Sequence, residues 1–196
     1  ENDLWSLSSN SAYQTVEDRN GNIWIATYGG GVNILVRKKD GGYHVYSPQN
    51  MLKKYPQRGF QKVRTIELDK EGNVWAGTTD GILIMSLKGD KFTATPLATP
   101  NDPAQGLASN DIICLRRDQQ GNMWVGTNSG GLSCTTDQDA NGCWLFENYG
   151  IEAGLPSEEI RSITFDNKGT VWFATDNMLC SFDIKKKIIT TFSTLD

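Results

Sequence analysis

Short runs of alternating apolar and polar residues recur along the chain, and each run is followed by a turn. Two examples are VRTIEL at 63–68 and IRSITF at 160–165. β-Branched residues in a period-two pattern predict half-buried β-strands. Each run leads into an Asp-x-x-Gly step, in which the carboxylate accepts backbone N–H groups and Gly takes a positive φ. The pattern therefore predicts strands joined by tight turns.

The same motif occurs four times. It reads D-x-x-G-(N/T)-(I/V/M)-W-x-(A/G)-T and lies within 17–27, 68–78, 117–127 and 165–175, so that one repeat is about 50 residues long. A fixed period of this length indicates a repeat fold in which each unit packs on its neighbours. One strand precedes the motif, and a second strand carries its Trp. We expect these two strands to be the inner two of the four strands of a propeller blade.

The second half of each repeat predicts two more strands. Third strands are expected at 32–36, 82–87 and 132–135, and fourth strands at 43–47, 91–96, 143–148 and 188–193. The fourth repeat lacks the Gly that precedes the third strand in the others. Short connections between four strands indicate an antiparallel meander. We therefore expect an all-β fold, a single β-propeller segment over 1–196 with four four-stranded antiparallel blades at about 7–48, 59–97, 107–149 and 155–194.

A further motif stands ahead of the inner strands. It reads GLASNDI at 106–112 and GLPSEEI at 154–160, with a fainter LSSNSA at 7–12. Together with the D-x-x-G and Trp motif, it resembles the two-component regulator propeller repeat over about residues 4–193. That resemblance implies part of the periplasmic sensor region of Bacteroidetes hybrid two-component histidine kinases, with the kinase and further blades elsewhere in the full-length protein. It also implies glycan-derived oligosaccharides as the ligand class.

Charge and hydropathy narrow the range of partners. The net charge is −4, and the basic residues form no run, so the sequence carries no electrostatic footprint for nucleic acid or anionic lipid. Apolar runs such as 82–85 are far shorter than the roughly 20 residues that span a bilayer. We expect no membrane insertion by this segment, and a signal peptide either absent or already removed.

Catalytic and cofactor chemistry is sparse in the sequence. The single His, His44, falls on a predicted outer strand, and the cysteines at 114, 134, 143 and 180 form no C-x-x-C pair for zinc. The glycines at 29–31 lie in a turn between strands and do not precede a helix, as a phosphate loop would. We expect no catalytic residue, no metal and no cofactor. Streptogramin lyases have a similar propeller with functional histidines, which a lone His does not supply.

The repeated motif residues are expected to be structural. A buried Trp removes on the order of 200 Å² from water, which favours packing between blades over ligand contact. One Asp per repeat ahead of a turn Gly favours a turn role over acid/base chemistry. The structural set is Trp24, Trp75, Trp124 and Trp172, then Asp18, Asp69, Asp118 and Asp166, then Gly21, Gly72, Gly121 and Gly169.

Ligand-binding residues are expected in the loops at one end of the predicted central channel. Planar polar groups and aromatic rings there are typical of carbohydrate sites, although solvated loop residues have the same composition. Arg64 and Arg161 are added because both occupy the second position of an inner strand, with solvated rim arginines as the alternative. The loop candidates are Trp5, Tyr28, Arg58, Asp80, Asn128, Asp176 and Asn177.

Three functions remain open at this stage. The first is a sensory or ligand-recognition segment, the second a non-catalytic scaffold or dimerisation segment, and the third, least favoured, a propeller lyase. An oxidising periplasm would also allow Cys134 and Cys143 to pair across one hairpin, whereas Cys114 and Cys180 are expected to be buried thiols.

The end blades give a prediction about association. Because the family builds larger rings, four blades would form an open arc with apolar faces on its first and last blades. We expect the isolated chain to associate through these faces, two arcs making an eight-bladed ring, as measured by light scattering at micromolar concentration. A stable monomer with low binding of hydrophobic dye would mean instead that the four blades close into a ring by themselves.

Overall fold

A computed structural model describes residues 5–98, 100 and 102–194 of the chain. The chain divides into two compact units that meet between Pro96 and Leu97. Each unit contains two four-stranded sheets, and in every sheet the strands are neighbours in the order in which they occur in the sequence. In the described part of the chain, no helix is long and apolar enough to cross a membrane.

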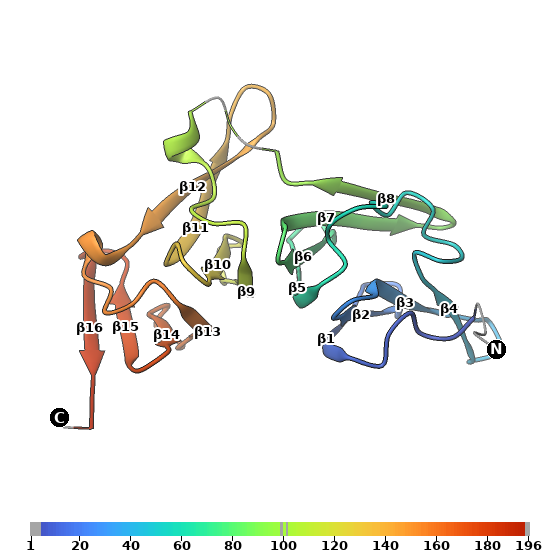
Figure 1. The fold of residues 1–196 in the computed structure, drawn as a ribbon, viewed down its shortest axis with the longest axis horizontal. Coiled ribbons are helices and arrows are strands. Elements are labelled where there is room, and N and C mark those ends of the chain that lie inside the picture. Colours follow the sequence, from blue (N-terminus) through green and yellow to red (C-terminus); the bar gives the residue numbers. More distant parts are fainter. Residues whose placement is uncertain (1–4, 99, 101, 195–196) are drawn as a thin grey trace. The chain divides into compact units, whose positions relative to one another are not determined.

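The first unit holds the sheets of repeats one and two, coloured blue to green in Figure 1. All neighbouring strands are antiparallel. The first sheet contains β1 (Ala12–Glu17), β2 (Ile23–Thr27), β3 (Gly31–Arg37) and β4 (Tyr43–Tyr46). The second contains β5 (Val63–Leu68), β6 (Val74–Thr78), β7 (Gly81–Lys88) and β8 (Lys91–Pro96).

The second unit repeats this arrangement, with one short 3₁₀ helix ahead of each sheet, at Pro103–Gln105 and Ile151–Ala153. Its strands are again antiparallel. The third sheet contains β9 (Ile112–Arg117), β10 (Met123–Thr127), β11 (Leu132–Gln138) and β12 (Trp144–Tyr149). The fourth contains β13 (Ile160–Phe165), β14 (Val171–Thr175), β15 (Leu179–Asp183) and β16 (Ile188–Phe192).

The prediction of four four-stranded antiparallel blades is confirmed. Strand bounds differ most in the third blade, where β11 continues to Gln138 and β12 begins at Trp144. A bulge between Thr135 and Gln138 lets the paired hairpin extend farther than the expected strand ends. The expectation that all four blades form one segment over 1–196, with the blade limits given above, stays a prediction.

One carboxylate in each repeat joins the turn to the core. In repeat three, Oδ1 of Asp118 accepts backbone N–H groups from Gln120 and Asn122, at 2.9 and 2.8 Å. Its Oδ2 accepts the Asn122 side-chain amide at 2.9 Å and the indole N–H of Trp124 at 3.0 Å. We call this arrangement the Asp–Trp clasp.

The clasp recurs in the other three repeats. The indole N–H donates to the Asp Oδ2 at 2.9 Å in Trp24–Asp18 and at 3.2 Å in both Trp75–Asp69 and Trp172–Asp166. A buried indole N–H needs an acceptor, and the Asp six residues earlier supplies it from across the hairpin. The motif Asp is therefore more than a turn residue, because it also binds the Trp.

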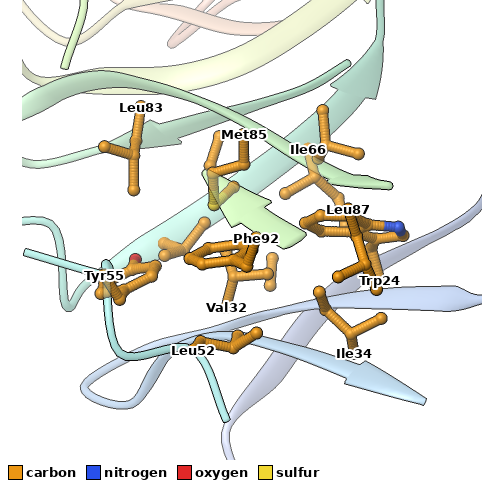
Figure 2. Packing of buried hydrophobic residues seen from close by; sticks show 14 residues of the cluster. Trp24, Val32, Ile34, Leu52, Tyr55, Ile66, Leu83, Met85, Leu87 and Phe92 are labelled. Atoms are coloured by element: carbon orange, nitrogen blue, oxygen red, sulfur yellow. The ribbon is translucent and has the colours of Figure 1, made fainter. Parts of the chain in front are cut away.

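Two of the clasped indoles, Trp24 and Trp124, pack between the neighbouring blades of their unit. Trp124 lies with its ring centroid 6.3 Å from Phe165 and 6.2 Å from Phe182, both in the fourth blade. In the first unit, Trp24 belongs to one buried cluster with Leu87 and Phe92 of the second blade, as Figure 2 shows. The same cluster includes Leu52 and Tyr55, from the connection between the two blades.

The suggested disulfide between Cys134 and Cys143 is wrong. The register pairs Cys134 with Glu147, and Cys143 precedes the first residue of β12, so the two cysteines do not face each other. All four cysteines are free thiols. Burial raises the pKa of Cys114 to about 12 and that of Cys180 to about 11, which keeps both protonated at neutral pH.

Two substitutions of the same motif residue test the packing. Trp124→Ala should destabilise the second unit by about 3–5 kcal/mol, because it leaves a cavity between two blades and removes a donor from Asp118. Trp172→Ala should cost less, because that indole stacks on Phe192 and stays partly exposed. Urea unfolding followed by circular dichroism measures both, and equal losses would contradict a special role for packing between blades.

The clasp also predicts that the stability of the fold depends on pH. Backbone N–H donation from Thr170, aided by the Trp172 indole, lowers the pKa of Asp166 to about 2. The unfolded value is about 3.9, so this carboxylate stabilises the fold above about pH 4, and the contribution is lost as pH falls toward 2. The difference in urea midpoint between the wild-type chain and Asp166→Asn should shrink over that range. A difference that stays constant from pH 5 to pH 2 would rule the linkage out.

Candidate functional site

The candidate site in the first unit lies where the loop after β2 meets the entry to β5. Tyr28 forms an isolated antiparallel bridge with Lys62, and its backbone N–H donates to the carbonyl of Ser11 at 2.9 Å. The N–H groups of Gly29 and Gly31 both donate to the carbonyl of Gln61, at 2.8 and 2.9 Å. The bridge to Lys62 and the bonds to Gln61 hold the loop of the first blade against the entry to β5 of the second blade.

An aromatic pair and two cations gather on this junction. The rings of Tyr13 and Tyr28 are stacked with their centroids 5.6 Å apart. The Nζ of Lys62 and the Cζ of Arg64 lie 5.6 and 5.9 Å from the centroid of the Tyr28 ring. We call these four residues the Tyr28 cluster. Tyr13 is 59% exposed, so the stacked pair offers an accessible aromatic surface.

β-Bulges explain why these side chains reach the junction. The pairing of β1 with β2 shifts between Ala12 and Gln14, and the pairing of β5 with β6 shifts between Val63 and Thr65. Tyr13 and Arg64 are therefore the extra residues of the two bulges. A bulge bends the strand and redirects the side chain, and bulges are common beside functional sites.

The second unit has the same backbone arrangement with different side chains. Asn128 takes the place of Tyr28, and its N–H donates to the carbonyl of Asp111 at 2.9 Å. Arg161 is the bulged residue of β13, as Arg64 is of β5, but it forms a 2.7 Å ion pair with Glu159, which stands at the position of Lys62. This junction therefore combines an amide with a neutralised arginine and lacks the ring of Tyr28.

The remaining candidates are more dispersed. Asp80 accepts the N–H of Phe60 at 3.1 Å, so its carboxylate holds the loop that also contains the exposed Arg58. Asp176 and Asn177 are exposed in the turn of the fourth blade. The ring centroid of Trp5 lies 6.4 Å from that of His44, a residue of the outermost strand β4. Trp5 is therefore not part of the Tyr28 cluster.

Two members of the cluster were not among the predicted ligand residues. Tyr13 occupies the same second position as Arg64 and Arg161, so its place in the repeat could have identified it. Lys62 lies in the entry loop one residue before β5, and only the bridge to Tyr28 brings it to the site. In the described ranges, no three His, Cys, Asp or Glu side chains are grouped as a metal site requires.

Comparisons with known proteins support the assignment of the repeats. The model of the two component regulator propeller matches residues 6–29, 58–80, 106–129 and 154–177. Each matched segment covers an entry loop, an inner strand and the strand that carries the motif Trp. A search of curated proteins finds no match to this sequence.

Solved structures show the same fold at low sequence identity. The extracellular domain of a protein from B. thetaiotaomicron assigned as a hybrid two component system is 23% identical, with a TM-score of 0.73. A second extracellular domain from that organism, assigned to a one component system, is 20% identical, with a TM-score of 0.75. Both matches cover 96% of this chain but only 24% and 26% of the other chains, so this chain spans about a quarter of their length.

A similar structure also occurs among enzymes. A catalytically inactive variant of virginiamycin B lyase from Staphylococcus aureus, solved with quinupristin, is 14% identical, with a TM-score of 0.64. The match covers 96% of this chain and 57% of the lyase. Extracellular domains assigned to two component and one component systems therefore share the fold with an enzyme, and the function has to be argued from the site.

Proposed function

We propose that this chain, which belongs to the two-component regulator propeller repeat family, is a ligand-recognition segment of an extracytoplasmic two-component sensor. The similar structures from B. thetaiotaomicron are extracellular domains, which supports a periplasmic location. Further blades and the kinase would be supplied by the rest of the full-length protein. In this proposal the segment recognises its ligand without transforming it.

The Tyr28 cluster is the observation that carries this proposal. A tyrosine ring offers a flat surface on which the apolar face of a sugar ring can stack. The two cations beside it, Lys62 and Arg64, offer donors to hydroxyl, carboxylate or sulfate groups. This chemistry fits a glycan-derived oligosaccharide, and the paired cations favour one that carries acidic groups.

The contrast between the two units strengthens the choice of site. At the equivalent junction of the second unit, Glu159 neutralises Arg161 and Asn128 replaces the tyrosine. An anionic sugar would lose its stacking surface there, and it would meet an acid in place of Lys62 and a paired arginine in place of Arg64. The first unit is therefore the better place for recognition, with Arg161 and Asn128 as secondary contacts.

The position of the single histidine favours recognition over catalysis. His44 lies on the outermost strand β4, beside Trp5, whereas the Tyr28 cluster lies at the inner strands. A general base must come within about 3 Å of the proton that it removes, directly or through one water. A ligand held on Tyr28 would therefore have no imidazole from this chain to act as its base.

Calorimetric titration with matched neutral and acidic oligosaccharides tests the proposal. Tyr28→Ala should weaken binding at least tenfold, which corresponds to about 1.4 kcal/mol of lost stacking. Lys62→Gln and Arg64→Gln should weaken binding of the acidic series more than that of the neutral series. Tyr43→Ala is the matched control, because Tyr43 is an exposed aromatic residue on β4 of the same blade.

Two results would overturn the proposal. One is unchanged affinity in Tyr28→Ala for every oligosaccharide that binds the wild-type chain. The other is turnover of a bound glycan or lactone by the purified chain, which would make it an enzyme. Thermal unfolding of each variant shows that any loss of binding does not come from loss of the fold.

A further inference from the structure

The four residues ahead of β1, residues 8–11, are hydrogen-bonded to the loop that carries Tyr28. The carbonyl of Ser11 accepts the backbone N–H of Tyr28 at 2.9 Å. The hydroxyl of Ser9 donates to the carbonyl of Tyr28 at 3.3 Å. We call residues 8–11 the strap. Its bonds to both backbone groups of Tyr28 fix the residue whose ring lies at the centre of the candidate site.

A buried amide of β3 holds the strap in place. Asn33 is 0% exposed. Its Oδ1 accepts the backbone N–H of Ser8 at 2.9 Å, and its Nδ2 donates to the Ser8 hydroxyl at 2.7 Å. That hydroxyl donates in turn to the carbonyl of Gly30 at 2.7 Å. We call these bonds the amide lock, because a buried amide needs partners at both ends and Ser8 provides both.

The loop after Tyr28 fits against the strap because it consists of glycines. A Cβ on Gly30 would overlap the hydroxyl of Ser8 and would lie 2.8 Å from that of Thr27. A Cβ on Gly31 would lie 2.9 Å from the ring of Tyr55. Neither position has room for a side chain, so the loop is packed against both the strap and Tyr55. The conformation of the loop therefore depends on where the strap lies.

The strap is also continuous with the second ring of the aromatic pair. Tyr13 follows its last residue by two positions, and the rings of Tyr13 and Tyr28 are stacked with their centroids 5.6 Å apart. The strap therefore leads into one ring and is hydrogen-bonded to the backbone of the other. Because an aromatic pair depends on the relative placement of its rings, a displaced strap would disturb the stack.

The amide is a feature of the first blade. The register of the second and third strands gives the counterparts of Asn33 in the other blades as Leu83, Ser133 and Cys180. The first and last of these side chains contain no amide. The hydroxyl of Ser133 donates to Oδ1 of Asn148, on the neighbouring strand β12, at 2.6 Å. The blade that carries the Tyr28 cluster is therefore the one with an amide at this position.

We propose that Asn33 is a positioning residue for the Tyr28 cluster, and that it acts through Ser8 and the strap to hold the Tyr28 ring against Tyr13. The strap is then part of the recognition site, although the cluster contains none of its side chains. A ring that is held in place before binding loses less conformational freedom when a ligand stacks on it. The effect on ligand affinity rests on the proposed function, whereas the placement of the ring can be measured without a ligand.

The ring-proton chemical shifts of Tyr28 in the ligand-free chain test the lock, with Tyr28→Ala used to assign the signals. Asn33→Leu introduces the residue that the second blade has at this position, and Ser8→Ala removes the hydroxyl of the lock. Each should remove about half or more of the shift that the stacked ring of Tyr13 causes. Because both variants break the same lock, the double variant should lose no more than the larger single loss.

Oligosaccharide titrations with the same variants test the role in recognition. Both should weaken binding of every oligosaccharide that binds the wild-type chain by about fivefold or more, neutral and acidic alike, because they displace the ring and remove no charge. Ser133→Ala is the matched control, because it removes a buried hydrogen bond at the same position of the third blade. It should change neither the Tyr28 signals nor the affinity. Thermal unfolding shows that each variant remains folded.

Three results would overturn the proposal. One is a set of Tyr28 signals that stay at their wild-type positions in both Asn33→Leu and Ser8→Ala. Another is displaced signals with unchanged affinity, if Tyr28→Ala does weaken binding. The third is an equal effect of Ser133→Ala, which would indicate a general loss of stability. If Tyr28→Ala leaves the affinity unchanged, the proposed function fails, and the ring signals alone decide whether the lock holds Tyr28.

Discussion

The hydrogen bond from each motif indole to an aspartate carboxylate is the interaction on which the blades depend. Burying Trp124 without an acceptor would leave its N–H unsatisfied, and burying Asp118 without donors would leave a costly charge. Because the carboxylate receives backbone N–H groups as well as the indole, one residue satisfies both requirements. The geometry of the turn and the position of the core aromatic are thereby coupled, which explains the constant spacing from Asp to Gly to Trp.

The clasp constrains one end of the blade and leaves the other end free to vary. At the free end, the second residue of each inner strand is bulged, so its side chain is not committed to the sheet core. The four repeats place Tyr13, Arg64, Ile113 and Arg161 at this position. A conserved backbone can therefore present a different chemistry in each blade, and the aromatic and cationic combination in the first unit follows from which residues meet there.

Variation also occurs at the clasped end, through the length of the outer hairpin. The longer hairpin of the second blade covers the indole of the first with Phe92 and Leu87. The shorter hairpin of the fourth blade ends before such a pair can form, and the indole of the third blade borders a cleft. The indoles of the first and third blades are nevertheless both 1% exposed, because Phe165, Phe182 and Tyr149 pack around the indole of the third blade.

The sequence by itself determined the repeat and its four strands, because local periodicity and turn chemistry carry that information. It also singled out Arg64 and Arg161 by their position in the repeat. The tertiary structure decided which side chains meet: it added Tyr13 and Lys62 to Tyr28, put Trp5 beside His44, and separated Cys134 from Cys143. The physical reason is that bulges, register and contacts between blades depend on residues far apart in the chain, which no local pattern encodes.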